Sequence, residues 1–102
     1  MFNSWNELFT GLLEALDDKW EGILEQLMNM KETMSDQKLM EMLKELKLEK
    51  HVTKINRTMY MSLLQYTQGD AHAKVVGNGL KLALDSYRYL YHKGKTKQPR
   101  IS

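Results

Sequence analysis

The sequence predicts an all-α protein, a compact bundle of about five or six helices. Three observations lead to this prediction. The 102 residues include one proline and six glycines, which leaves few breaks in regular structure. The apolar residues recur at intervals of three and four, the spacing that gathers them on one face of a helix. The segments that flank Gly77-Asn78-Gly79, the strongest candidate for a hairpin turn, lack the alternation of apolar and polar residues that is typical of a half-buried strand.

The first helix is predicted to begin at Ser4, because Ser4 and Glu7 form a capping-box pattern. Its apolar stripe is broader than a surface helix needs, and it contains Trp5, Leu8, Phe9, Leu12, Leu13, Ala15 and Leu16. Gly11 costs about 1 kcal/mol relative to alanine within a helix, so we expect a close packing contact there. Asp17 and Asp18 either cap a second helix or form a solvated patch on one helix that continues to residue 31.

A third helix follows a break at residues 33–36, with Ser35 or Asp36 as its N-cap. Its apolar face contains Leu39, Met42, Leu43 and Leu46. Residues 48–54 are predicted to connect it to a fourth helix, which runs from Thr53 to about Tyr66. The stripe of this fourth helix contains Ile55, Met59, Tyr60, Leu63 and Leu64.

Two further helices are predicted in the last third of the chain. Asp70 is expected to cap a short helix that contains Ala71, Ala73, Val75 and Val76. The segment 77–79, Gly-Asn-Gly, then marks the strongest break in the sequence. A last helix begins at Leu80 and ends at Gly94, with Ala83, Tyr87 and Leu90 on one face. A hairpin turn at 77–79 is the alternative, but the residues that follow are poor strand formers.

We predict one helical domain over residues 1–93 and a basic C-terminal tail over residues 94–102. The length of the chain favours a single modest core. The predicted core consists of Trp5, Phe9, Leu12, Trp20, Leu24, Leu43, Leu63 and Leu90.

Charge is divided unequally along the chain. Residues 1–50 carry 11 acids and 6 bases, net −5, whereas residues 51–102 carry 2 acids and 9 bases, net +7; together these give the overall +2. Such a division is typical of a half that faces nucleic acid or a membrane, or of head-to-tail association between copies. The alternative is that acidic helices pack beside basic ones within one fold.

The composition argues against several classes of protein. The chain has no cysteine, which excludes disulfides and thiol nucleophiles and is compatible with the cytoplasm. The three histidines, His51, His72 and His92, lack the spacing of a metal site. No phosphate-binding loop or nucleophile motif occurs. No apolar run is long enough to span a membrane, and the first residues do not look like a signal peptide. We therefore predict no enzyme activity, no cofactor, no metal, no small-molecule substrate and no membrane partner.

Two groups of residues are candidates for binding. Aromatic side chains between cations can stack on unpaired bases while lysines and arginines contact phosphates. The predicted nucleic-acid-binding residues are Tyr87, Arg88, Lys95, Lys97 and Arg100. Methionine-rich surfaces are adaptable binding faces, and several of the eight methionines cluster around the break at 33–36. The predicted self-association residues are Met30, Met34, Met40 and Glu41. The alternative is that the tyrosines and the methionines fill the core.

The second half of the chain resembles the capsid-like helical region of retrotransposon Gag polyproteins of the copia type. The resemblance rests on residues 63–71, Leu-Leu-Gln-Tyr-Thr-Gln-Gly-Asp-Ala, then Gly79-Leu80, and then residues 86–91, Ser-Tyr-Arg-Tyr-Leu-Tyr. The opening, Phe-Asn-Ser-Trp at residues 2–5, is similar to the start of the same region. The resemblance to this family covers most of residues 2–98 loosely and is best over residues 59–91.

This resemblance implies a fold like the N-terminal domain of a capsid and a structural role. Such a protein self-associates into a homo-oligomer and contacts RNA or other nucleic acid weakly and non-specifically. The resemblance also implies that the chain is a piece, or a stand-alone remnant, of a longer polyprotein. Two other functions fit the sequence: a small helical adaptor that binds a partner helix, and a stand-alone nucleic-acid-binding module.

Overall fold

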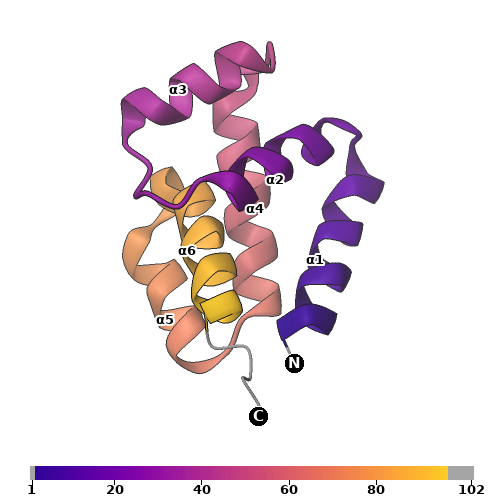
Figure 1. The fold of residues 1–102 in the computed structure, drawn as a ribbon, viewed down its shortest axis with the longest axis vertical. Coiled ribbons are helices and arrows are strands. Elements are labelled where there is room, and N and C mark those ends of the chain that lie inside the picture. The colour runs from indigo at the N-terminus through magenta and orange to yellow at the C-terminus, as the bar shows by residue number, and fades with distance from the viewer. Residues whose placement is uncertain (1, 97–102) are drawn as a thin grey trace.

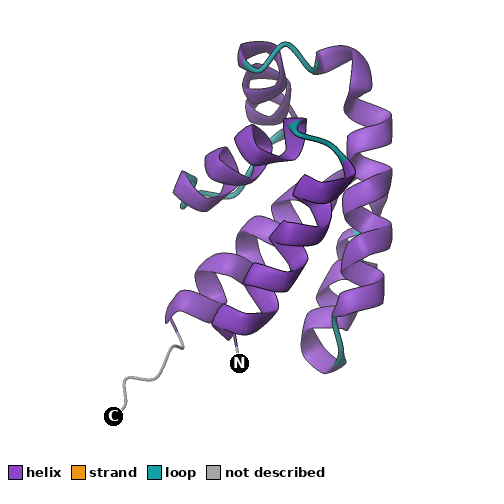
Figure 2. Ribbon diagram, turned by 90° about the vertical axis from the view of Figure 1, so that its right-hand side faces the viewer, coloured by secondary structure: helices purple, strands orange, loops and turns teal. Residues whose placement is uncertain are grey.

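The computed structural model describes residues 2–96, and the side chains of residues 5–94. Over this range the chain forms α1 (Phe2–Leu16), α2 (Lys19–Asn29), α3 (Asp36–Glu45), α4 (Val52–Tyr66), α5 (Gly69–Asn78) and α6 (Ala83–Thr96). Two short 3-10 helices, η1 (Glu49–His51) and η2 (Leu80–Leu82), precede α4 and α6. None of these residues forms a strand (Figure 2). The prediction of an all-α bundle of five or six helices is confirmed, and the hairpin alternative at 77–79 is wrong.

The six helices form a compact bundle in which α6 is central. The Cα radius of gyration is 13.1 Å, close to the roughly 13 Å expected of a compact 100-residue domain. Helix α6 packs against α1, α2, α4 and α5. Figure 1 places α1 and α5 on opposite sides of the bundle and α3 at one end of its long axis. The start of α1 and the end of α6 lie at the opposite end, next to the turn between α4 and α5 (Figure 1).

The core contains most of the predicted residues. Phe9, Trp20, Leu24, Leu43 and Leu63 are buried. The other three predicted core residues, Trp5, Leu12 and Leu90, are half-buried. Further buried side chains come from every helix, and they include Leu13, Ile23, Leu27, Met59, Val75, Leu84 and Tyr87. One continuous apolar cluster therefore holds all six helices together.

A break at Asp17 and Asp18 separates α1 from α2. Asp17 Oδ1 accepts the Lys19 backbone N–H at 3.0 Å, and Asp17 Oδ2 forms a 3.1 Å ion pair with Lys19 Nζ. The hydrogen bond from the Lys19 backbone, aided by the Lys19 ammonium, lowers the pKa of Asp17 below its ordinary value. Of the two alternatives left open by the sequence, the structure shows two helices with Asp17 satisfying the start of the second.

The predicted helix ends are only partly correct. Ser35 is the N-cap of α3, and its side chain accepts the Lys38 backbone N–H, as expected. Helix α1 begins at Phe2, so Ser4 lies inside the helix and the N-cap predicted there is wrong. Asp70 lies in the first turn of α5, after the Gln68 N-cap, and makes no cap. Fraying and tertiary packing shift such boundaries by one or two residues.

The C-terminal part departs further from prediction. Gly79 ends α5 with φ +80°, a backbone conformation that glycine adopts without a steric penalty. Gly94 is not a C-cap, because α6 continues through it to Thr96. The predicted division between residues 93 and 94 therefore falls within α6. Residues 97–102 of the predicted tail lie outside the described residues.

Candidate functional site

Tyr87 is a core residue, which corrects the prediction that it contacts nucleic acid. Its side chain is fully buried. The ring stacks on Phe9 and on Tyr91 with centroids 5.5 and 6.2 Å apart, and its hydroxyl donates a 2.6 Å hydrogen bond to Asn6 Oδ1. Burial raises the pKa of this hydroxyl far above its usual value, with smaller contributions from Tyr91 and Glu14. No face of the ring is open to a base.

Arg88 is also internal, so its predicted contact with phosphate is wrong. Only 6% of Arg88 is exposed, and its Nε donates a 2.7 Å bond to Asp85 Oδ1. The same carboxylate oxygen accepts the Met34 backbone N–H at 2.8 Å, and an Arg88 guanidinium nitrogen donates to the Lys31 carbonyl at 3.3 Å. We call these contacts the Asp85–Arg88 clasp. It ties the loop between α2 and α3 to α6.

The structure does not describe the side chains of the other three predicted nucleic-acid-binding residues. Lys95 lies in the last turn of α6, beyond the last side chain that the structure describes. Lys97 and Arg100 lie outside the described residues. Their contact with nucleic acid stays a prediction.

A basic and aromatic groove lies instead between α5 and α6. Lys74 Nζ lies 4.5 Å from the centroid of the Tyr89 ring and Lys93 Nζ lies 5.5 Å from it, both within cation–π range. The groove has a volume of about 650 Å³. Its lining residues are Gln68, Asp70, Ala71, Lys74, Tyr89, Leu90, Lys93 and Gly94. We call it the Tyr89 groove; it offers two exposed ammonium groups beside a half-buried ring and one carboxylate.

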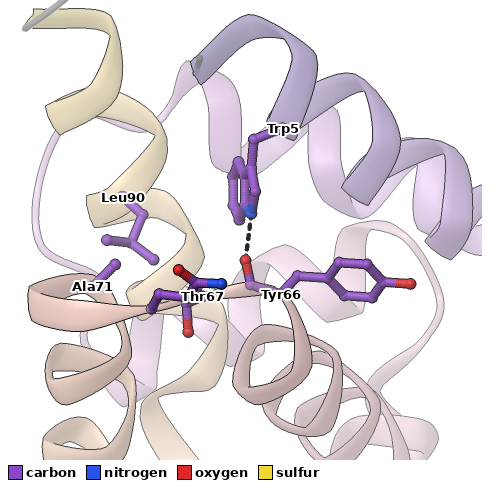
Figure 3. Close-up of a pocket in the computed structure, with 6 residues that line it drawn as sticks. Trp5, Tyr66, Thr67, Ala71 and Leu90 are labelled. Carbon is purple, nitrogen blue, oxygen red and sulfur yellow. Dashed lines mark hydrogen bonds between the residues drawn. The ribbon is translucent and has the colours of Figure 1, made fainter.

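An apolar pocket adjoins the Tyr89 groove, with which it shares Gln68, Ala71 and Leu90. It has a volume of about 390 Å³, and Trp5, Tyr66 and Thr67 complete its lining. The Trp5 indole N–H donates a 2.6 Å hydrogen bond to the Tyr66 carbonyl, which fixes the ring across one side of the pocket (Figure 3). Four helices meet here, and the apolar side chains lie beside the lysines of the groove.

The predicted self-association residues do not form one exposed surface. Met34 lies in the loop between α2 and α3 and its side chain is buried in the core, so the prediction that it contacts another copy is wrong. Met30 is half-buried. Met40 and Glu41 are exposed on α3, and their contact with another copy stays a prediction.

The most exposed large apolar side chains lie on α1. Leu8 is 73% exposed and Leu16 is 61% exposed, with Leu12 half-buried between them. Gly11 and Ala15 are exposed beside these leucines. We call these five residues the α1 face. The apolar stripe of α1 is therefore broad because it has two sides: Phe9 and Leu13 enter the core, whereas the α1 face is open to solvent.

Sequence reasoning missed both the Tyr89 groove and the exposure of the α1 face. The helical spacing did separate Tyr89 from Tyr87 and Tyr91, which are one turn apart. It could not show which side of α6 packs inward. The breadth of the α1 stripe was a signal for two apolar faces.

The structure preserves the uneven distribution of charge. Residues 2–29, which form α1 and α2, contain six acids and one base: Glu7, Glu14, Asp17, Asp18, Glu21, Glu25 and Lys19. Residues 52–96, which form α4 to α6, contain seven bases and two acids: Lys54, Arg57, Lys74, Lys81, Arg88, Lys93, Lys95, Asp70 and Asp85. Acidic α1 and the basic C-terminal helices meet near the end of α1, where Lys54 of α4 lies close enough to Asp17 to help lower its pKa.

The described residues contain neither a cluster of metal ligands nor a membrane-spanning helix. No group of three or more histidine, aspartate or glutamate side chains there is arranged to hold a metal ion. No helix there is long and apolar enough to cross a membrane. Comparisons with protein-family models, with curated proteins and with solved structures give no match for this chain.

Proposed function

We propose that this chain is a structural, non-catalytic protein of the retroelement Gag type, which self-associates and contacts RNA non-specifically in the cytoplasm. The observation that carries the proposal is the α1 face. Covering an exposed leucine is worth about 1.5–3 kcal/mol, so displaying Leu8 and Leu16 on one helix favours association. The sequence resemblance names the type of structural protein that this surface would serve.

The division of charge supports association between copies. Acidic α1 and α2 and basic α4 to α6 attract each other across two molecules, while identical surfaces repel. This long-range attraction is weakened by salt, because the Debye length is only about 8 Å at physiological ionic strength.

The Tyr89 groove supports the contact with RNA. A strand that follows the groove would place its phosphates beside Lys74 and Lys93 and an unpaired base in the adjoining apolar pocket. The Asp70 carboxylate in the same groove opposes a phosphate and keeps such binding weak. The same groove favours the second candidate function, a dedicated nucleic-acid-binding module.

Light scattering over a concentration series tests self-association. We expect the mean mass to rise as the protein concentration increases over the range of about 10–300 µM, where weak contacts form. The double variant Leu8→Glu, Leu16→Glu should remain monomeric over the same range. A matched control, Thr33→Glu with Thr53→Glu, adds the same charges at exposed polar sites and should associate like the wild type. A wild-type protein that stays monomeric throughout contradicts the proposal and favours an adaptor.

Anisotropy with a labelled single-stranded oligouridylate tests the contact with RNA. Binding should weaken steeply as salt rises, because each neutralised phosphate releases a counterion. The variant Lys74→Gln, Lys93→Gln should bind more weakly, whereas Lys44→Gln, Lys50→Gln, which removes two exposed lysines elsewhere, should bind as the wild type does. Affinity that is independent of salt would exclude lysine-phosphate contacts, and a loss only on removing residues 97–102 would assign binding to the tail.

A further inference from the structure

A second exposed apolar surface lies on α5 and the turn that follows it. Val76 is 50% exposed and Leu80 is 39% exposed. Ala73 and Gly77 are exposed on the same helix as Val76, and Ala73 lies three residues before Val76 and four before Gly77, which places all three on one side of α5. We call these four residues the α5 face. Its neighbours Lys74 and Lys81 are exposed as well, so cations border the apolar residues.

The α1 face and the α5 face are complementary in charge. Exposed Glu7 and Glu14 border the α1 face, whereas Lys19 and Lys54 lie at its Leu16 end, in a hollow that they line together with Asp17. The lysines beside the α5 face outnumber the single nearby acid, Asp70. Two α1 faces placed together would bring carboxylates against carboxylates, whereas an α1 face on an α5 face brings carboxylates against ammonium groups.

Both faces contain a helical glycine that the fold itself does not require. A Cβ added at Gly11 or at Gly77 would meet nothing within 4 Å, and neither residue has a positive φ. Gly22 differs, because an added Cβ there would lie 3.2 Å from a Leu46 methyl group. Glycine weakens a helix relative to alanine, so its presence at the centre of both exposed faces is accounted for by close approach of a second helix.

We propose that the α1 face of one copy docks against the α5 face of the next copy. This inference rests on the proposed function and names the two surfaces that associate. The contact is heterologous, and each molecule that offers its α1 face still has its α5 face free. Helices α1 and α5 lie on opposite sides of the bundle (Figure 1), and repetition of a heterologous contact produces an open chain or a closed ring.

Mixing two variants, each lacking one face, tests this arrangement. The α1 variant is Leu8→Glu, Leu16→Glu, and the α5 variant is Ala73→Lys, Val76→Lys; all four positions are exposed, and circular dichroism confirms the helix content of each. Alone, each variant should be monomeric at the concentration where the wild type assembles. Mixed in equal amounts, they should form dimers and no larger species, because each mixed pair uses its one intact α1 face and its one intact α5 face.

The outcomes separate the two proposals. If the wild type associates but the α5 variant still associates fully, or the mixture stays monomeric, the heterologous contact is wrong while self-association stands. If the wild type is monomeric at every concentration, both proposals fail. Raising salt should weaken the mixed dimer at least several-fold, and a dimer that is insensitive to salt would contradict the charge pairing.

Discussion

Helices α6 and α1 use their side chains in opposite ways. Helix α6 buries six consecutive residues, 83–88, which include the charge pair Asp85 and Arg88, whereas α1 leaves Leu8 and Leu16 mostly exposed. In α6 the polar groups find partners inside the protein, so their burial is tolerated. In α1 these two leucines keep most of their apolar surface in contact with solvent. The contrast indicates that α6 serves the fold and that α1 is available for contacts with other molecules.

The comparison between α6 and α1 predicts its largest loss of stability for a substitution in the Asp85–Arg88 clasp. Asp85→Ala should lower the free energy of unfolding by about 3 kcal/mol or more, because it leaves the Arg88 guanidinium buried without its carboxylate and the Met34 N–H without its acceptor. Chemical denaturation measures the change. The control Glu25→Ala, at an exposed position on α2, should change stability by less than about 0.5 kcal/mol. Equal effects of the two substitutions would show that the clasp is not structural.

A smaller effect is expected where α6 and α1 are joined. Tyr87→Phe removes the hydroxyl that donates to Asn6 but keeps the stacked ring, so it should cost about 1 kcal/mol. The control Tyr60→Phe alters a half-buried tyrosine of α4 and should cost less. Because Phe9 and Tyr91 still hold the ring, the helix content should be unchanged. If Tyr87→Phe lowered the free energy of unfolding as much as Asp85→Ala does, the Tyr87 hydroxyl would contribute more than its one hydrogen bond to Asn6.

At Gly11 the expected effect on stability has the opposite sign. Gly11→Ala should stabilise the monomer by about 0.5–1 kcal/mol, because the added methyl group meets open space and the helix gains propensity. The same substitution should weaken association if α1 approaches a second helix closely. Gly22→Ala is the matched comparison, and its methyl group must displace a Leu46 methyl. A monomer destabilised by Gly11→Ala would show that this glycine serves the fold.

The smallest effect is expected at the end of α1 and depends on pH. The lowered pKa of Asp17 means that its charged form stabilises the folded state. This contribution is present above the unfolded pKa of about 4 and is lost as pH falls through the folded value. Asp17→Asn should therefore lower the thermal midpoint slightly at neutral pH, and the difference from wild type should shrink on acidification. A difference that grew at low pH would contradict this assignment.

The sequence was sufficient to predict the helices but not which polar residues are internal. Apolar spacing is a local property, and it correctly placed Phe9, Leu43 and Leu63 in the core. The sequence predicts that Arg88 contacts phosphate because Arg88 lies among tyrosines and other bases. Its burial depends on Asp85 and on the loop that precedes α3, 51 residues away from Asp85 in the sequence. Such long-range contacts leave no periodic pattern.

The candidate site was predicted least well, for the same reason. A tyrosine-rich segment among bases was recognised, but only the packing of α6 determines that Tyr89 faces the groove and Tyr87 the core. Lys74, which completes the groove, comes from a different helix, 15 residues earlier. Met34 was placed on the surface because the segment between α2 and α3 is a break, although this break folds over the core.

The indole of Trp5 gives the protein a built-in optical reporter. It is half-buried at the edge of an apolar pocket and hydrogen-bonded to a backbone carbonyl, whereas Trp20, the second of the two tryptophans, is only 3% exposed. Any molecule entering the pocket would change the emission of one fluorophore and leave the other as an internal reference. Occupancy can then be followed without labels, in the unmodified chain.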